Sequence, residues 1–228
     1  MMKGLAVRLL GACATVLIVA GCATSPTPKE SGFLGDYSKL QKMPAPGGGS
    51  RLAYLNPDFT PARYKAVLLE SVTYYPQPQP SDAVSMATLD DIRTYVDTSL
   101  RQKLGQKVRL VNQAGPGVAR IRVAITAVGT ESQALKAYQY IPVALVITGA
   151  RALAEGGRPQ DASVAIETSI TDSMTQEVLY AAVRGGTGER VQSAAQGQGG
   201  VQAGSLRPLI DTWTDGASSE ITRFVAPR

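Results

Sequence analysis

The chain has 228 residues, no histidine, two cysteines and a formal net charge of +5. The lack of histidine excludes the Ser-His-Asp arrangement and removes the most common metal ligand of proteins. Nucleic-acid binding is not predicted either, because the basic residues are scattered and no aromatic residues are interleaved with them.

The N-terminal residues 1–21 have the three zones of a bacterial export signal. Lys3 and Arg8 provide a positive start, and an apolar run follows over residues 9–20. This run is too short to cross a hydrocarbon core of roughly 30 Å as a stable helix. Residues 18–23 read Ile-Val-Ala-Gly-Cys-Ala, which resembles the lipobox of bacterial lipoproteins.

The lipobox resemblance implies cleavage between Gly21 and Cys22 and acylation of Cys22 by chains such as palmitate. Two or three acyl chains make such an anchor effectively permanent. Ala23 stands where an Asp would favour the inner membrane, so the same resemblance implies an outer-membrane lipoprotein. We expect its domain to face the periplasm, although the sequence leaves exposure at the cell surface open. Cleavage also removes Cys13, and the mature domain then has no disulfide and no thiol nucleophile. The net charge falls by two, to +3, because the two basic residues of the signal are lost.

Residues 22–50 are predicted to form the lipidated cysteine, a tether and a docking segment. Residues 23–30 are too polar to pack, whereas residues 31–37 contain Phe33 and Leu34, which we expect to dock on the domain. Residues 44–50 have the Pro and Gly composition of a loop.

A single domain is predicted over residues 51–228. Residues 64–74 indicate a strand, and apolar residues at helical spacing follow over residues 89–104, with a capping box at Thr88 and a C-terminal glycine at Gly105. Short apolar runs at residues 108–110 and 119–128 indicate two more strands.

The second half of the domain is predicted to contain a hairpin and a final helix. Residues 163–171 and 178–183 alternate as two paired strands, and residues 192–204 form a mobile Gln/Gly loop. The final helix runs to Phe224, with Ser205 as its N-cap and Pro208 in its first turn. The element order predicts an α+β fold: a two-layer sandwich in which two helices cover one face of a mixed, mostly antiparallel sheet of about five strands.

Residues 133–159 form an apolar insert that leaves three alternatives open. It is a short helix packed on its own sheet, a contact surface for a partner, a second copy or the membrane, or a spanning element formed only in an oligomer. The residues proposed for the contact surface are the large apolar ones: Tyr140, Val143, Leu145, Val146, Ile147 and Leu153.

No catalytic residue, cofactor or metal site is predicted, and the chain is interpreted as a non-enzyme. It has no nucleophile elbow, no P-loop and no metal-binding Cys/His spacing. Residues 185–188, Gly-Gly-Thr-Gly, are interpreted as a turn because they follow a hairpin strand and precede no Lys-Ser/Thr pair. Asp90 and Asp91 point to different sides of the first helix. They are interpreted as acids that stabilise its N-terminal end through the helix dipole.

Four stretches resemble a Gram-negative lipoprotein family catalogued as domain of unknown function 3313. They are residues 31–38 (Ser-Gly-Phe-Leu-Gly-Asp-Tyr-Ser), 64–67 (Tyr-Lys-Ala-Val), 115–126 (Gly-Pro-Gly-Val-Ala-Arg-Ile-Arg-Val-Ala-Ile-Thr) and 172–177 (Asp-Ser-Met-Thr-Gln-Glu). One departure is Gln176, where the hairpin turn is expected to have Gly. The resemblance implies an envelope lipoprotein with no assigned activity.

Three functions remain open from the sequence. The first is a non-catalytic module that binds an envelope protein or the cell wall, and the second is an oligomeric subunit of an export pore. The third is a hydrolase without histidine, which would gather dispersed acids such as Glu70, Asp82 and Glu167 in one pocket.

Overall fold

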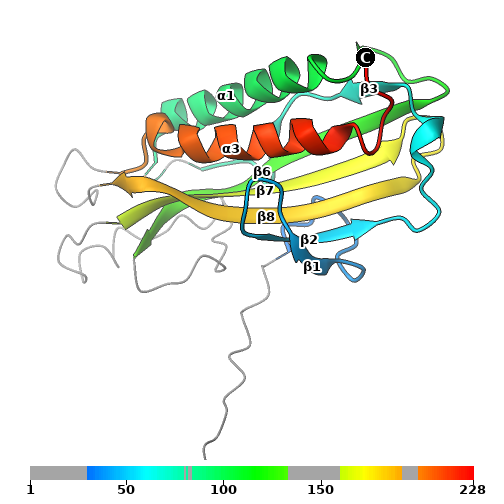
Figure 1. The fold of residues 1–228 in the computed structure, drawn as a ribbon. Helices are drawn as coiled ribbons and strands as arrows, with labels where there is room; N and C mark the ends of the chain where they lie inside the picture. Colours follow the sequence, from blue (N-terminus) through cyan, green and yellow to red (C-terminus); the bar gives the residue numbers. More distant parts are fainter. Residues whose placement is uncertain (1–29, 80, 82–83, 133–159, 192–199) are drawn as a thin grey trace, which may run out of the picture.

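Two helices lie side by side on one face of a single mixed sheet (Figure 1). The fold comes from a computed structural model that describes residues 30–79, 81, 84–132, 160–191 and 200–228. The predicted α+β class and the two helices on one face are confirmed. The signal, Cys22, the insert of residues 133–159 and all six residues of the predicted contact surface lie outside the described residues.

The sheet has eight strands rather than about five. Its order is β1 (Gln41–Pro44), β2 (Ser50–Leu55), β8 (Val178–Val191), β7 (Gln160–Asp172), β6 (Val118–Ser132), β3 (Ala66–Leu69) and β5 (Leu110–Val111), and β4 (Thr73–Tyr74) pairs with β6 beyond β3. β3, β4 and β5 are parallel to their neighbours, and the other pairs are antiparallel. A 3-10 turn, η1 (Pro61–Arg63), leads into β3.

Two features of the chain explain the larger strand count. The segment that was expected to be only tether and loop supplies β1 and the start of β2. The strand predicted over residues 64–74 is interrupted, because the Val72 backbone N–H donates to the Asp97 carboxylate at 2.9 Å rather than to a neighbouring strand.

The first helix, α1 (Met86–Gly105), begins earlier than predicted. Its N-cap is Ser85, whose hydroxyl accepts from the Thr88 backbone N–H at 3.1 Å, so Thr88 is the third helical residue. Gly105 is the last helical residue, and Gln106 follows it in the right-handed region rather than the left-handed one. The apolar stripe is confirmed, since Leu89 and the other stripe residues of α1 are buried.

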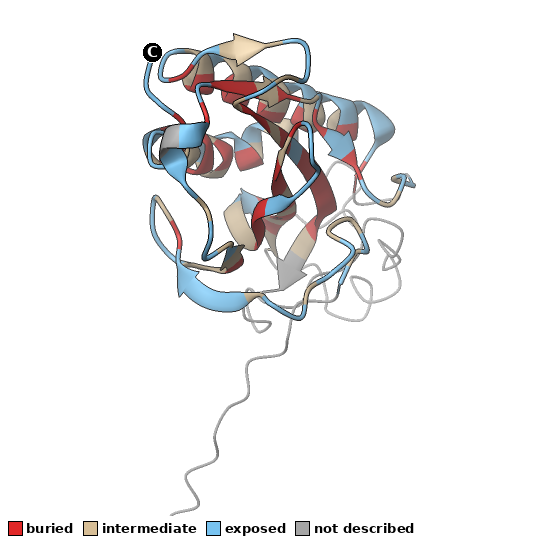
Figure 2. Cartoon of the chain, turned by 90° about the vertical axis from the view of Figure 1, so that its right-hand side faces the viewer, coloured by how far each residue is buried: buried red, intermediate tan, exposed pale blue. Residues whose placement is uncertain are grey.

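The second helix, α3 (Ala203–Ile221), also begins earlier than predicted. Gln202 is its N-cap, so Ser205 lies inside the first turn and Pro208 lies inside the helix. The predicted mobile loop of residues 192–204 is therefore wrong at its C-terminal end, where the chain is already helical. Figure 2 shows that the buried residues gather where the helices meet the sheet, and α3 contributes Leu206, Ile210 and Trp213 to them.

The prediction of a turn at residues 185–188 is wrong, because these residues lie inside β8 and residues 185–187 pair with β7. The glycines are needed for a different reason. A Cβ at Gly186 would lie 2.8 Å from the Trp213 ring, and one at Gly188 would collide with the Ser205 carbonyl. Both glycines therefore allow α3 to cross β8 at close range.

The turn between β7 and β8 contains the residue that departs from the family pattern. Gln176 has φ 64°, the conformation that favours glycine. Its side chain stabilises the turn by donating to the Ser173 carbonyl at 2.9 Å and accepting from Arg120 at 3.2 Å.

Candidate functional site

The segment next to the predicted lipid anchor docks on the face of the sheet opposite the helices. Side chains alternate along a strand, and Ile166 and Thr168 of β7 face the helices, so Glu167 between them points to the other face. The Glu167 side chain lies under the N-terminal segment, and the residue is only 1% exposed. The Tyr37 hydroxyl donates to its carboxylate at 2.7 Å.

The docked segment folds around the Tyr37 hydroxyl. This oxygen accepts hydrogen bonds from the backbone N–H groups of Gly32 at 2.9 Å and Leu34 at 3.3 Å. Burial raises the pKa of Glu167, and hydrogen bonds from Tyr37, Ser31 and Leu34 offset part of that rise. Burial also raises the pKa of Tyr37. We call the contact between residues 31–37 and Glu167 the N-terminal latch.

An aromatic contact holds the middle of the same segment. The Phe33 ring centre lies 4.8 Å from the guanidinium carbon of Arg122 and 5.8 Å from the Tyr75 ring centre. Arg122 and Arg120 also contact the Glu70 carboxylate, at 3.7 and 3.3 Å. The opposite face of the sheet is therefore a polar and aromatic surface that the N-terminal segment partly covers.

The other face of the sheet contains a cavity of about 140 Å³ beneath the two helices. Ile121 and Ile170 form part of its floor, Leu100 of α1 and Ile210 of α3 form part of its walls, and Trp213 borders it. The predicted alternation of β6 and β7, with these apolar residues on one side, is confirmed. The lining is almost entirely apolar, which suits a hydrophobic ligand more than a reaction.

Two arginines and one glutamate are the charged residues that line the cavity. Arg51 of β2 forms two hydrogen bonds of 2.7 Å with the Glu220 carboxylate of α3. The hydrogen bonds with Glu220 raise the pKa of Arg51. Arg184 of β8 donates to the carbonyls of Pro46 and Gly48 at 2.9 and 2.8 Å, and it lies 4.7 Å from the Trp213 ring centre.

Burial, together with the nearby Arg51 charge, lowers the pKa of Arg184 to about 10. Among the described residues, no carboxylate forms an ion pair with Arg184 within 4.0 Å. Its direct contacts given above are with carbonyl oxygens and an aromatic ring, and Glu220 acts on its charge only at longer range. A partly buried cation without a counter-ion is costly unless something else solvates it.

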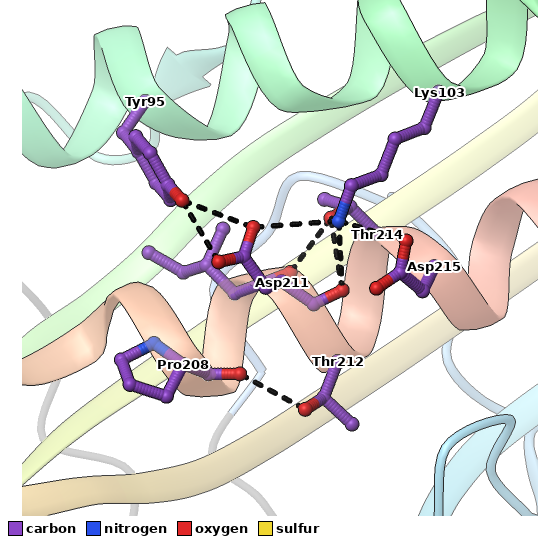
Figure 3. Close-up of polar contacts among 8 residues, drawn as sticks. Tyr95, Lys103, Pro208, Asp211, Thr212, Thr214 and Asp215 are labelled. Atoms are coloured by element: carbon purple, nitrogen blue, oxygen red, sulfur yellow. Dashed lines mark hydrogen bonds and ion pairs between the residues drawn. The ribbon is translucent and has the colours of Figure 1, made fainter.

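A polar cluster between α1 and α3 is the other concentration of titratable groups (Figure 3). The Lys103 ammonium contacts Asp215 at 2.8 Å, Asp211 at 3.3 Å and the Thr214 hydroxyl at 2.9 Å. The Tyr95 hydroxyl donates to both Asp211 oxygens, at 3.0 and 2.9 Å. The hydrogen bond to Asp211 raises the pKa of Tyr95.

This cluster links the two helices rather than forming a reaction site. Burial lowers the pKa of Lys103, but hydrogen bonds to Asp215 and Asp211 outweigh it, so the net direction is upward. Lys103 therefore stays protonated and cannot act as a base at neutral pH.

The acids that a hydrolase would need have other partners. Glu70 contacts two arginines and Glu167 is held by the N-terminal latch, while Asp82 lies outside the described residues. Within the described part of the chain, no group of three potential metal ligands was found. No helix in that part is long and apolar enough to span a membrane.

Sequence reasoning did not identify Glu167 or Arg184 as residues with a special environment. Glu167 had a signal, because an acid interrupts a strand whose alternate residues are apolar or small. Arg184 had a weaker one, since it follows the apolar run of β8 directly. Neither signal indicates the partner, because Tyr37 is 130 positions from Glu167 and Pro46 is 138 positions from Arg184.

Comparison with known proteins gives a clear relationship in sequence and only weak ones in structure. Residues 29–217 match the family described as a protein of unknown function, DUF3313. The chain is 35% identical over 176 residues to the uncharacterized lipoprotein YdcL of Escherichia coli K12, and the match covers 76% of this chain and 79% of that protein.

The similar solved structures are distant. The PelC dodecamer from Paraburkholderia phytofirmans is 14% identical with a TM-score of 0.36, over 74% of this chain and 98% of that one. A minor lipoprotein from Acinetobacter baumannii is 12% identical with a TM-score of 0.30, over 70% of this chain and 94% of that one. Similarities this weak imply nothing about assembly or activity. The sequence match, in contrast, confirms the resemblance, and the chain belongs to the lipoprotein family described as domain of unknown function 3313.

Proposed function

We propose that this lipoprotein is a non-catalytic interaction module, held at the outer membrane by lipid on Cys22 and facing the periplasm. The observation that carries the proposal is the N-terminal latch, which fixes the segment next to the anchor on one face of the sheet. The eight residues 23–30 span at most about 30 Å when extended. We therefore expect the latched face to lie toward the bilayer and the helices to lie away from it.

The chemistry of the described residues supports a binding role. The acids Glu70, Glu167 and Asp211 are each held by structural partners, and the sequence has no histidine. A binding module needs only a stable, anchored surface, which the sheet and its two helices supply.

The proposed contact surface is the insert of residues 133–159, which joins β6 to β7. Ser132 pairs with Gln160, and Gln160 pairs with Val191, so the insert and residues 192–199 leave the sheet at the same end. An envelope protein or the cell wall would bind there through Tyr140, Val143, Leu145, Val146, Ile147 and Leu153.

The anchoring part of the proposal is tested by feeding cells radiolabelled palmitate and fractionating their membranes. We expect label on the wild-type protein, and we expect the Cys22→Ala protein to be unlabelled and released from the membrane fraction. A Cys22→Ala protein that still sediments with outer membranes would contradict the proposal.

The contact part is tested by placing a photo-crosslinking residue at Val143 or Leu153 in cells. The matched control is Met174, which is 61% exposed in the turn at the opposite end of β7. We expect a discrete adduct from the two insert positions and none from position 174. Equal adducts from all three positions, or none at all, would show that the insert is not the contact surface.

A further inference from the structure

The cavity beneath the helices remains partly open although it is lined by apolar side chains. Ile166 and Thr168 face the helices from the middle of β7, yet both stay partly exposed. Glu167, between them on the other face, is buried. The usual pattern is thus inverted at this point, because the helix-facing side of the strand is the more accessible one.

The space is a cavity rather than a packing irregularity because of its size. At about 140 Å³ it is close to the roughly 150 Å³ engineered cavity that stays dry and binds benzene. A cavity of this size lowers the stability of a domain unless a ligand fills it. An apolar group of about that size, such as part of an alkyl chain, would bury the lining of Ile121, Val123 and Ile166.

The charged residues that line the cavity indicate what kind of headgroup the ligand has. Arg51 and Glu220 neutralise each other, and the buried Arg51 Nε has no hydrogen-bond partner. Arg184 adds a positive charge that has no ion-pair partner of its own among the described residues, because Glu220 is paired with Arg51 and acts on Arg184 only at longer range. The cavity lining therefore carries one excess positive charge, beside the ring of Trp213.

We propose that this cavity binds a single-chain amphiphile with an anionic headgroup, with the alkyl chain between α3 and the sheet and the headgroup at Arg184. The carbonyls of Pro46 and Gly48 hold the guanidinium in place. An anionic headgroup supplies the counter-ion that Arg184 lacks, through a charge-assisted hydrogen bond. A free fatty acid and a lysophospholipid share this chemistry.

Trp213 makes the proposal directly testable because it is the only tryptophan in the chain and it lines the cavity. A bromine atom on a bound alkyl chain quenches the fluorescence of a tryptophan that it contacts. The experiment titrates mature Cys22→Ala protein, which needs no detergent, with 10-bromodecanoate and with 10-bromodecanol below their micelle concentrations. We expect saturable quenching by the carboxylate and at least about tenfold weaker binding of the alcohol.

Two variants separate the headgroup from the chain. Arg184→Gln should weaken binding of the carboxylate about tenfold and leave the alcohol unchanged, whereas Arg184→Lys should retain most of the preference for the carboxylate. Ala217→Leu, which fills the cavity from α3, should abolish quenching by both ligands. The matched control is Arg190→Gln, which removes an arginine that is 63% exposed on the same strand as Arg184.

Competition with unlabelled decanoate and with lysophosphatidylglycerol then distinguishes the two sources, because the tighter competitor identifies which one fits. Equal affinity for the alcohol and the carboxylate would overturn the proposal. Quenching that does not saturate would also overturn it, as would full binding by the Ala217→Leu protein. These outcomes do not depend on lipid anchoring or on the insert, so this inference and the proposed function can fail separately.

Discussion

Glu167 is buried near the middle of β7, and the segment that covers it begins close to the predicted lipid anchor. A buried carboxylate is unfavourable unless hydrogen bonds replace the water that it loses. Here Tyr37 donates directly, and the same hydroxyl oxygen organises the backbone of the segment around it. In the latch, the Tyr37 hydroxyl thus donates to the buried carboxylate and also accepts the hydrogen bonds that shape the covering segment.

Replacing Tyr37 with Phe should release the latch. The substitution keeps the ring but leaves the buried Glu167 without its 2.7 Å donor, so we expect the free energy of unfolding to fall by about 2 kcal/mol. Limited proteolysis should cut within residues 31–37 faster than in the wild type. The control is Tyr54→Phe on β2, two strands away from β7. If both variants unfold at the wild-type urea midpoint, the hydroxyl does not hold the segment.

The pH dependence of stability should reveal Glu167 as well. Its pKa is raised by burial, so the folded protein binds this proton more tightly than the unfolded chain. Its contribution to stability is complete below the ordinary glutamate pKa and decreases as the pH rises through the raised value. Urea unfolding of the wild type and Glu167→Gln between pH 4 and 8 measures this contribution. The difference between their free energies of unfolding isolates Glu167, because the other titratable groups are the same in both proteins. A difference that stays constant with pH would contradict the buried, shifted carboxylate.

Single residues show what the sequence could and could not predict. The family pattern led us to expect Gly at position 176, and Gln176 adopts the positive φ that glycine favours, although the sequence alone did not predict that conformation. Glu167 was noted only as a dispersed acid, because periodicity gives the face of a strand but not what covers that face.

At the scale of elements, α3 and the loop between β1 and β2 meet at a glycine. A Cβ at Gly216 would lie 2.7 Å from the Pro46 Cβ and 2.9 Å from its backbone carbonyl carbon and oxygen. The same loop supplies the carbonyls that hold Arg184. The position of α3 over the sheet thus depends on contact with the backbone of this loop.

Gly216→Ala should destabilise the domain although alanine is the better helix former. The helix preference contributes about 1 kcal/mol in favour of Ala, whereas overpacking against a backbone costs about 1–3 kcal/mol. We expect a net loss of stability in urea unfolding. Gly204→Ala in the same helix meets no atom within 4 Å and should be neutral or stabilising. A similar increase in stability from both substitutions would show that the loop can move away from α3 at little cost in free energy.

The elements were predictable to different degrees. Both apolar helix stripes and the β7–β8 hairpin were predicted because each depends on local periodicity and turn composition. The helix starts at Met86 and Ala203 were missed, since Ser85 and Gln202 compete as caps with residues only three positions further along. The glycines of β8 were taken for a turn because their reason, the close crossing of α3, is a tertiary contact.

At the scale of the whole molecule, the N-terminal segment and the core are separate sources of stability. The described core cluster contains no residue before Ala53, whereas the latch involves residues 31–37 on the other face of the sheet. The two layers were predicted from the element order, but the occupation of both sheet faces was not. The cavity was also unpredictable, because it depends on how well distant side chains fill the space under the helices.

Deleting residues 30–40 should therefore leave a folded domain. We expect cooperative urea unfolding and an unchanged near-ultraviolet signal from Trp213, with a loss of stability at least as large as that of Tyr37→Phe. In the shortened protein, Glu167 is exposed to water, so Glu167→Gln should no longer change the pH dependence. Loss of the cooperative transition would mean that the segment is part of the core.

The position of the latch also determines how the protein responds to mechanical force. In the anchored form that we propose, a load that pulls the domain away from the bilayer would act on the chain through Cys22 and would reach residues 31–37 before any described strand. We therefore expect the hydrogen bonds at Glu167 to break first, which would free about ten residues while the helices and the sheet stay folded. Release of the N-terminal latch would thus lengthen the linker between the anchor and the domain under tension and leave the domain folded.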